Sequence, residues 1–132
     1  MDEIIDRILS ESRTVAVVGL SDKPGRPSHA VARYLQERGY RVIPVNPLLT
    51  EALGEKAYGT LSDIPGKVDL VDVFRKSAEL PALAEEALRI GARFFWMQEG
   101  VVSESARKLL SKAGIPVVMD RCVKKELAKR GR

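Results

Sequence analysis

The sequence predicts a Rossmann-like α/β domain, in which helices cover both faces of a doubly wound, five-stranded parallel sheet to give three layers, α/β/α. The first observation is the unbroken apolar run Val15–Val18, which is typical of a strand buried on both faces. The second is that helical patterns end at Gly39, Gly91 and Gly114, each followed almost at once by another apolar run. The third is a spacing of roughly 30 residues between strand starts, as in βαβ units.

Right-handed crossovers between these strands build a parallel sheet. We expect the spatial order third, second, first, fourth, fifth, with the strands counted along the chain. Ligands of such sheets bind beyond the carboxyl ends of the strands, where the winding reverses. This order would place the loop after Gly19 beside the loop after Met97.

The N-terminal half begins with an expected amphipathic helix, because apolar side chains recur at helical spacing within Met1–Ser12. The first strand, over 14–18, leads into a loop rich in Gly, Pro and basic residues. Ser28 is expected to cap the following helix. The apolar side of that helix carries Val31, Tyr34 and Leu35. A second strand over 40–45 ends at Asn46-Pro47.

The C-terminal half repeats the pattern after a less regular segment. Residues 48–67 predict a crossover with only short helical turns. Ser77 and Ser103 are expected to cap two helices with apolar residues at helical spacing. The remaining strands are expected over 68–74, 94–97 and 115–118. The tail from Asp120 is expected to be short, helical and basic.

Length and composition favour one soluble domain over 1–132, with a core at about 12–120 and the N-terminal helix and basic tail packed on it. No apolar run approaches the roughly 20 residues of a membrane helix, and residues 1–12 lack a signal-peptide pattern. Cys122 is the single cysteine, which fits a reducing compartment. We therefore expect a cytoplasmic protein without membrane contact or a metal site. A net charge of +4 is too mild to demand nucleic acid.

The stretch from strand to helix over 14–35 is the arrangement by which α/β proteins hold phosphate. Backbone N–H groups are free in the loop and first helical turn, and the helix dipole favours an anion there. Lys23 and Arg26 lie in this loop and would add positive charge. The alternative is that both are ordinary surface charges on a structural loop that binds nothing.

The residues around the loop narrow the choice of ligand. A dinucleotide-binding domain is expected to carry Gly-x-Gly-x-x-Gly after the first strand and an acidic residue after the second. This loop has only Gly19 and Gly25, and Asn46 stands where NAD would require a carboxylate. The Walker lysine motif is also missing, which argues against nucleoside triphosphate hydrolysis. A nucleotide with more phosphate than NAD fits these residues better.

Four segments resemble the small stand-alone CoA-binding proteins of bacteria and archaea. They are Val-Val-Gly-Leu-Ser-Asp-Lys-Pro-Gly-Arg-Pro-Ser-His, Gly-Tyr-Arg-Val-Ile-Pro-Val-Asn-Pro, Val-Asp-Val-Phe-Arg and Trp-Met-Gln-Glu-Gly. This family is similar to the CoA-binding domain of the succinyl-CoA synthetase α subunit and of ADP-forming acyl-CoA synthetases. The resemblance covers about residues 12 to 127.

The resemblance implies a CoA site assembled from four loops. Coenzyme A phosphates would lie against the first loop, the adenosine near the end of the second strand, and the thiol arm along the loops after the third and fourth strands. In that order the implied residues are Gly19, Ser21, Asp22, Lys23, Pro24, Gly25, Arg26 and Ser28; Asn46 and Pro47; Phe74, Arg75 and Lys76; and Gln98, Glu99 and Gly100.

The departure from the synthetases limits the implied activity. Those enzymes need a second domain with a phosphorylatable histidine, whereas this chain has one histidine, His29, inside the cofactor loop. We therefore expect a CoA or acyl-CoA binding protein without catalytic residues of its own, or one that works with an unidentified protein partner. An NAD(P)-binding oxidoreductase-like protein and a nucleotide-sensing regulator are the alternatives. The first lacks the acidic ribose residue, and the second lacks a helix-turn-helix domain.

Two polar side chains have open interpretations. Cys122 stands beside basic residues that would lower the pKa of its thiol and make it reactive; the alternative is a buried inert cysteine. We expect it to lie nearer the sheet edge than the point where the winding reverses. Glu99 either lies near the ligand or forms a salt bridge to Arg75 or Arg121.

Structural roles are expected for several further residues. His29 is expected to be a solvated polar side chain in the first helical turn. Asp69 and Asp72 are expected to cap neighbouring loops, and Phe95 and Trp96 to fill the core.

Overall fold

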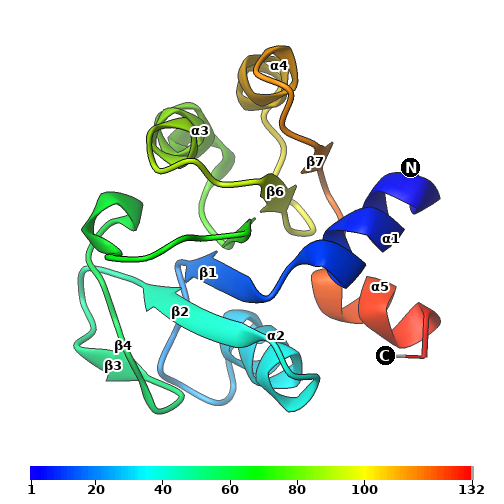
Figure 1. Cartoon of the computed structure of the whole chain (residues 1–132). Helices are drawn as coiled ribbons and strands as arrows, with labels where there is room; N and C mark the ends of the chain where they lie inside the picture. The colour runs from blue at the N-terminus through cyan, green and yellow to red at the C-terminus, as the bar shows by residue number, and fades with distance from the viewer. Residues whose placement is uncertain (132) are drawn as a thin grey trace.

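The computed structural model describes residues 1–131 and contains a five-stranded parallel sheet between two helical layers (Figure 1), which confirms the predicted fold class. The strands of the sheet are β1 (Thr14–Val18), β2 (Arg41–Val45), β5 (Leu70–Val73), β6 (Phe94–Met97) and β7 (Val117–Val118). The helices are α1 (Asp2–Glu11), α2 (Pro27–Glu37), α3 (Leu80–Arg89), α4 (Glu104–Lys112) and α5 (Val123–Lys129).

Alternation along each strand explains why both faces of the sheet are covered. In β1, Ala16 and Val18 face the layer of α3 and α4, whereas Val15 and Val17 face the layer of α1, α2 and α5 (Figure 1). All four side chains are at most 5% exposed. An unbroken apolar run is therefore necessary, because a polar residue at either parity would enter one of the two cores.

The predicted strand order is wrong. The sheet runs β2-β1-β5-β6-β7, so the third strand of the sequence pattern pairs with β1 instead of lying outside β2. The outer edge of β2 is occupied by Tyr58, which forms a parallel bridge to Val45 and exchanges backbone hydrogen bonds with Pro44 and Asn46. The winding reverses between β1 and β5. The loop after Gly19 consequently lies beside the loop after β5 and not directly beside the loop after β6.

The segment 48–67 contains a hairpin that the sequence pattern did not predict. Strands β3 (Glu51–Ala52) and β4 (Glu55–Lys56) pair in antiparallel fashion, and their turn holds Leu53 at φ 53° and Gly54 at φ 77°. Leucine is an unusual residue at positive φ, and this turn lacks the Asn-Gly signal of such hairpins. The expected short helical turn is present as a 3₁₀ helix, Leu61–Asp63.

Of the three predicted helix caps, one is confirmed. The Ser103 hydroxyl accepts a hydrogen bond from the Ala106 N–H and caps α4. Ser77 instead starts a 3₁₀ turn before α3, and its hydroxyl accepts from the Val102 N–H at 2.9 Å. Ser28 lies inside α2, because Pro27 takes the first helical position and Arg26 the cap.

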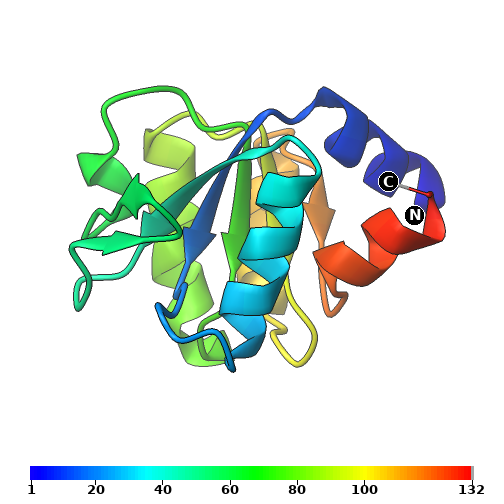
Figure 2. The ribbon, with the colours of Figure 1, turned by 90° about the horizontal axis from the view of Figure 1, so that it is seen from below.

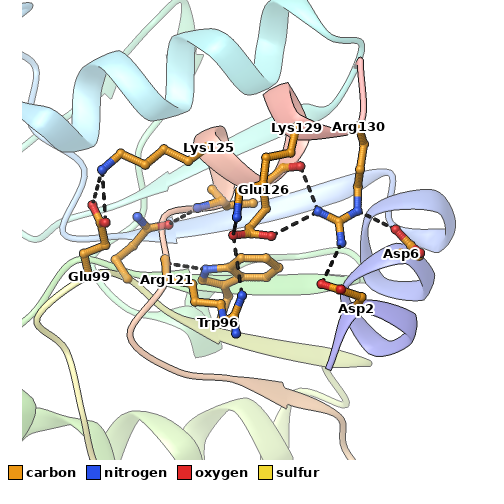
Figure 3. A network of polar contacts seen from close by, with 11 residues as sticks. Asp2, Asp6, Trp96, Glu99, Arg121, Lys125, Glu126, Lys129 and Arg130 are labelled. Atoms are coloured by element: carbon orange, nitrogen blue, oxygen red, sulfur yellow. Dashed lines mark hydrogen bonds and ion pairs between the residues drawn. The ribbon is translucent and has the colours of Figure 1, made fainter.

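The two terminal helices pack together beside the sheet (Figure 1). Arg130, the C-cap residue of α5, forms ion pairs with Asp2, Asp6 and Glu126 (Figure 3). Burial raises the pKa of Glu126, but hydrogen bonds from Arg130 and Lys129 outweigh that effect and lower the pKa overall.

None of the helices within residues 1–131 has the length and apolar character needed to cross a membrane.

Of the two aspartates expected to cap neighbouring loops, only Asp69 does so. The Asp69 carboxylate does cap a neighbouring segment, accepting from the Arg13 and Thr14 N–H groups at 2.9 and 3.0 Å. Asp72, in contrast, is fully buried between Val17 and Trp96 in sheet register, and neither carboxyl oxygen has a hydrogen-bond partner. Burial raises its pKa well above the usual value.

His29 is also buried, at 9% exposure, where a solvated side chain was expected. It lies in the first turn of α2, on the side of the helix that packs onto the domain. Phe95 and Trp96 fill the core as predicted, and the Trp96 Nε1–H donates to the Arg121 carbonyl at 2.8 Å.

Asp72 generates a prediction about pH dependence. In the folded state the carboxyl keeps its proton at pH values where the unfolded chain, with a pKa of about 3.9, has lost it. The unfolded state then binds fewer protons, so stability falls as the pH rises from about 4 to the raised folded pKa. The slope approaches that of one proton, about 1.4 kcal/mol per pH unit.

Asp72→Asn removes this titration. Urea unfolding of wild type and variant at pH 4 to 8 should give a free-energy difference that shifts steadily in favour of the variant as the pH rises. Parallel pH profiles for wild type and Asp72→Asn would contradict a protonated Asp72.

Candidate functional site

The candidate site is a cleft at the carboxyl ends of the strands. Figure 2 shows the blue loop after β1 and the yellow loop after β6 at the same edge of the domain. Two hollows form the cleft, one of about 880 Å³ and one of about 430 Å³. Arg26, Pro27 and Phe74 line both of them, so the two hollows adjoin at the point where the winding reverses.

Gly19 sets the path of the loop at this point. Its φ is +87°, and a Cβ atom there would lie 2.4 Å from the Phe74 carbonyl oxygen. Its N–H donates to the Val45 carbonyl at 2.8 Å. Only glycine allows the chain to leave β1 in this direction and pass so close to the end of β5.

Hydrogen bonds hold the loop after Gly19 against α2 and β2. The Ser28 hydroxyl accepts from the Ser21 N–H at 3.0 Å, and the Ser21 hydroxyl accepts from the Lys23 N–H at 3.1 Å. The Asn46 amide donates to the Leu20 carbonyl and accepts from the Leu48 N–H. Both serines and Asn46 thus shape the loop from within the protein, and all three line the smaller hollow.

Positive charge in the cleft is only partly neutralised. Lys23 and Arg26 are exposed and form no ion pair with any residue of 1–131, and the first turn of α2 carries no acidic residue. Arg75 is paired with Glu79 at 2.7 Å, and that hydrogen bond lowers the pKa of Glu79. The uncompensated charge therefore lies at the N-terminus of α2, where the helix dipole also favours an anion.

At the far end of the larger hollow, the loop after β6 is bonded to the start of α5 (Figure 3). Gln98 is buried, and its Oε1 accepts from the Val123 N–H at 3.3 Å. Glu99 pairs with Lys125 at 3.1 Å and not with either arginine named from the sequence. The Gly100 N–H donates to Asp120 Oδ1 at 2.7 Å.

The sequence-predicted residues do not all face the cleft. Most of them line one of the two hollows. The exceptions are Pro24, Gly25, Pro47 and Gly100, which line neither. Pro47 lines a separate hollow of about 190 Å³ together with Gly19 and Arg75.

Other lining residues were missed or misplaced by the sequence reasoning. Leu48 is 88% exposed and lines the smaller hollow, and its position directly after Asn46-Pro47 was the available signal. Cys122 follows the edge strand β7, as expected, but it also lines the larger hollow with Gln98 and Glu99. The segment after β7 turns back beside the loop after β6, as the Trp96 and Gly100 hydrogen bonds to residues 120 and 121 require.

Comparison with known proteins identifies relatives of this chain in sequence and in fold. The family model of the CoA binding domain matches residues 13–128. The Bacillus subtilis (strain 168) protein YneT is 50% identical over 120 residues, which is 91% of this chain and 89% of that protein. A solved structure of a hypothetical protein from Pyrococcus horikoshii OT3 superimposes with a TM-score of 0.94 at 39% identity, covering 98% of this chain and 91% of the other.

A longer enzyme contains a similar segment. The ADP-forming acetate–CoA ligase of Methanocaldococcus jannaschii is 25% identical over 87 residues, which is 66% of this chain but only 12% of the ligase. The similarity is thus confined to one part of that enzyme. With the family model matching nearly the whole chain, and with the cleft at the point where the winding of the sheet reverses, this protein belongs to the CoA-binding domain family.

Proposed function

We propose that this protein binds coenzyme A or an acyl-CoA in the cleft and does not transform it without a partner. The observation that carries the proposal is the uncompensated charge of Lys23 and Arg26 at the N-terminus of α2. Backbone N–H groups, the helix dipole and two cations there suit the phosphates of CoA. The donor set fits an anionic cofactor, and no carboxylate in the first helical turn opposes it.

The adenosine is proposed to lie over the end of β2. Leu48 offers an exposed apolar side chain at the edge of the smaller hollow, beside the phosphate loop. A purine ring placed on it would cover that surface. Asn46 contributes indirectly, since its amide holds the Leu20 carbonyl and the Leu48 N–H in place.

The pantetheine arm is proposed to follow the larger hollow from Phe74 toward Gln98 and Glu99. That hollow starts at Arg26, which also lines the phosphate end, and reaches Cys122. Arg75 is paired with Glu79, whereas Lys76 forms no ion pair with the described residues. The side chains around the thiol end would form hydrogen bonds with the arm and define the shape of its site. We propose that the protein acts in the cytoplasm.

The proposal of binding without turnover rests on the residues at that thiol end. Glu99 is committed to Lys125, and a single carboxylate without an aligned nucleophile does not complete an acyl-transfer mechanism. Sequence similarity to the ligase spans 12% of that enzyme, so ligation would require further domains or subunits. The alternative of an NAD(P) enzyme is weaker, because no carboxylate follows β2.

Calorimetry with CoA, dephospho-CoA, acetyl-CoA, NAD and NADP tests the proposal directly. We expect CoA and acetyl-CoA to bind with one-to-one stoichiometry and NAD to bind far more weakly. Preferential binding of NAD or NADP would contradict the proposal.

The phosphate loop is tested by charge removal. Lys23→Ala and Arg26→Ala should each weaken CoA binding by about 1–3 kcal/mol, the range of charge-assisted hydrogen bonds, while the unfolding midpoint stays close to wild type. Arg33→Ala is the matched control, because this exposed arginine of α2 pairs with Glu37 and lines neither hollow. An unchanged dissociation constant in the double variant would remove the loop from the site.

Leu48 is tested by shortening its apolar side chain. Leu48→Ser should weaken CoA binding by about 1 kcal/mol, since less than a full leucine side chain becomes covered by the base. Binding of 4′-phosphopantetheine, which lacks the nucleoside, should not change. Equal losses for both ligands would show that Leu48 acts on the loop and not on the base.

The absence of turnover is tested with a panel of acyl-CoAs, alone and with ATP or GTP. We expect no release of CoA and no nucleotide-dependent ligation by the isolated protein. Turnover in wild type that disappears in Glu99→Gln would overturn the proposed binding role and assign Glu99 to catalysis.

A further inference from the structure

A third hollow lies at the opposite end of the sheet from the cleft. It has a volume of about 260 Å³ and is lined by Ser12, Arg13, Arg38, Gly39 and Tyr40. These residues come from the two connections that lead from α1 into β1 and from α2 into β2. We call it the basal pocket.

The fold brings these two connections together. The Arg41 N–H donates to the Arg13 carbonyl at 2.8 Å, so the starts of β1 and β2 are joined by the sheet ladder. Gly39, at φ +94°, turns the chain at the end of α2. In Figure 2 both connections lie at the upper edge, away from the loops of the cleft.

The charge of the basal pocket is not neutralised by the protein. Neither Arg13 nor Arg38 has an ion-pair partner in the described part of the chain. The carboxylates closest in sequence pair with other arginines: Glu11 with Arg7 and Arg93, and Glu37 with Arg33. Asp69 accepts from the backbone N–H groups of Arg13 and Thr14, and it forms no ion pair with either guanidinium group of the pocket.

A buried hydroxyl in the same wall also lacks a partner. Ser12 is 5% exposed, and its Oγ has no hydrogen-bond partner within the protein. A buried polar atom without a partner is costly, and such atoms are few in native structures. The Oγ atom itself has almost no exposed surface, so a ligand in the pocket would reach it only after a small shift of the Ser12 side chain.

We propose that the basal pocket binds a phosphate-class oxyanion. The guanidinium group presents several N–H donors in a planar fork that matches phosphate oxygens. The Arg38 guanidinium stacks over the Tyr34 ring at 4.4 Å from the centroid, which restricts its motion and makes ordering by a ligand less costly. The ligand is inorganic phosphate or the phosphoryl group of a monoester.

A purely structural role for the two arginines makes a different prediction. Both lie close to the C-termini of α1 and α2, where a cation interacts favourably with the helix dipole. If that were their whole role, their removal would lower stability without changing anion binding. The experiment therefore measures both quantities.

Amide chemical shifts are followed during titration with inorganic phosphate, and separately with glycerol 3-phosphate, at constant ionic strength. The protein carries Lys23→Gln and Arg26→Gln, so that phosphate binding in the cleft loop does not contribute. We expect saturable shifts at Arg13, Gly39 and Tyr40. Adding Arg13→Gln and Arg38→Gln should weaken this binding at least tenfold, and adding Ser12→Ala should weaken it less.

Arg33→Gln is the matched control, because Arg33 is an exposed arginine of α2 that pairs with Glu37. It should leave the titration unchanged. Tighter binding of the monoester than of phosphate would identify a larger phosphorylated ligand, and the reverse would identify the free ion. The proposal would be overturned by chemical-shift changes that do not saturate or that persist in the double arginine variant. It would also be overturned if Arg33→Gln weakened binding as much as the double arginine variant does. Thermal unfolding of each variant verifies that it is folded, and failure of CoA binding in the cleft would not affect this outcome.

Discussion

The close contact between Gly19 and the Phe74 carbonyl is the constraint on which the cleft depends. With a hypothetical Cβ atom only 2.4 Å from that oxygen, any side chain would force the ends of β1 and β5 apart. Because these two strands flank the point where the winding reverses, their separation determines whether Arg26 and Phe74 line one continuous cleft. The loop after Gly19, the start of α2 and the wall of the larger hollow all take their positions from this contact.

Within residues 1–131, the domain has regions where charged side chains have ion-pair partners and regions where cations have none. Around the terminal helices, Arg130 and Glu126 are enclosed in a network in which each charge has partners. Lys23 and Arg26 at the start of α2 have no ion-pair partner within residues 1–131, and the same is true of the two arginines of the basal pocket. Uncompensated charge costs little where water reaches it, and it attracts anions from solution. The two regions with unpaired cations lie at opposite ends of the sheet, so occupation of one does not sterically exclude occupation of the other.

Asp72 contrasts with Glu126, although both are buried carboxyl groups. Glu126 stays ionised because arginine and lysine reach it, whereas Asp72 meets only apolar strand neighbours and is held protonated. Asp72 lies on β5, two residues before Phe74, which follows the strand and lines both hollows of the cleft. A buried acid without partners reduces stability, and at this position the reduction falls on the strand that supports the ligand site.

The sequence by itself determined the fold class, most of the helix and strand positions, the glycine-containing loop after β1 and the family. Those features follow from local periodicity, from glycines that end helical patterns and from contiguous motifs, all of which are properties of neighbours along the chain. The tertiary structure alone decided the strand order, the Glu99–Lys125 pair, the place of Cys122 in the cleft and the burial of Asp72. Each depends on which segment packs beside which: Tyr58 occupies the edge of β2, and the segment after β7 turns back toward β6. Periodicity carries no record of such pairings, since both strand orders satisfy the same right-handed crossovers.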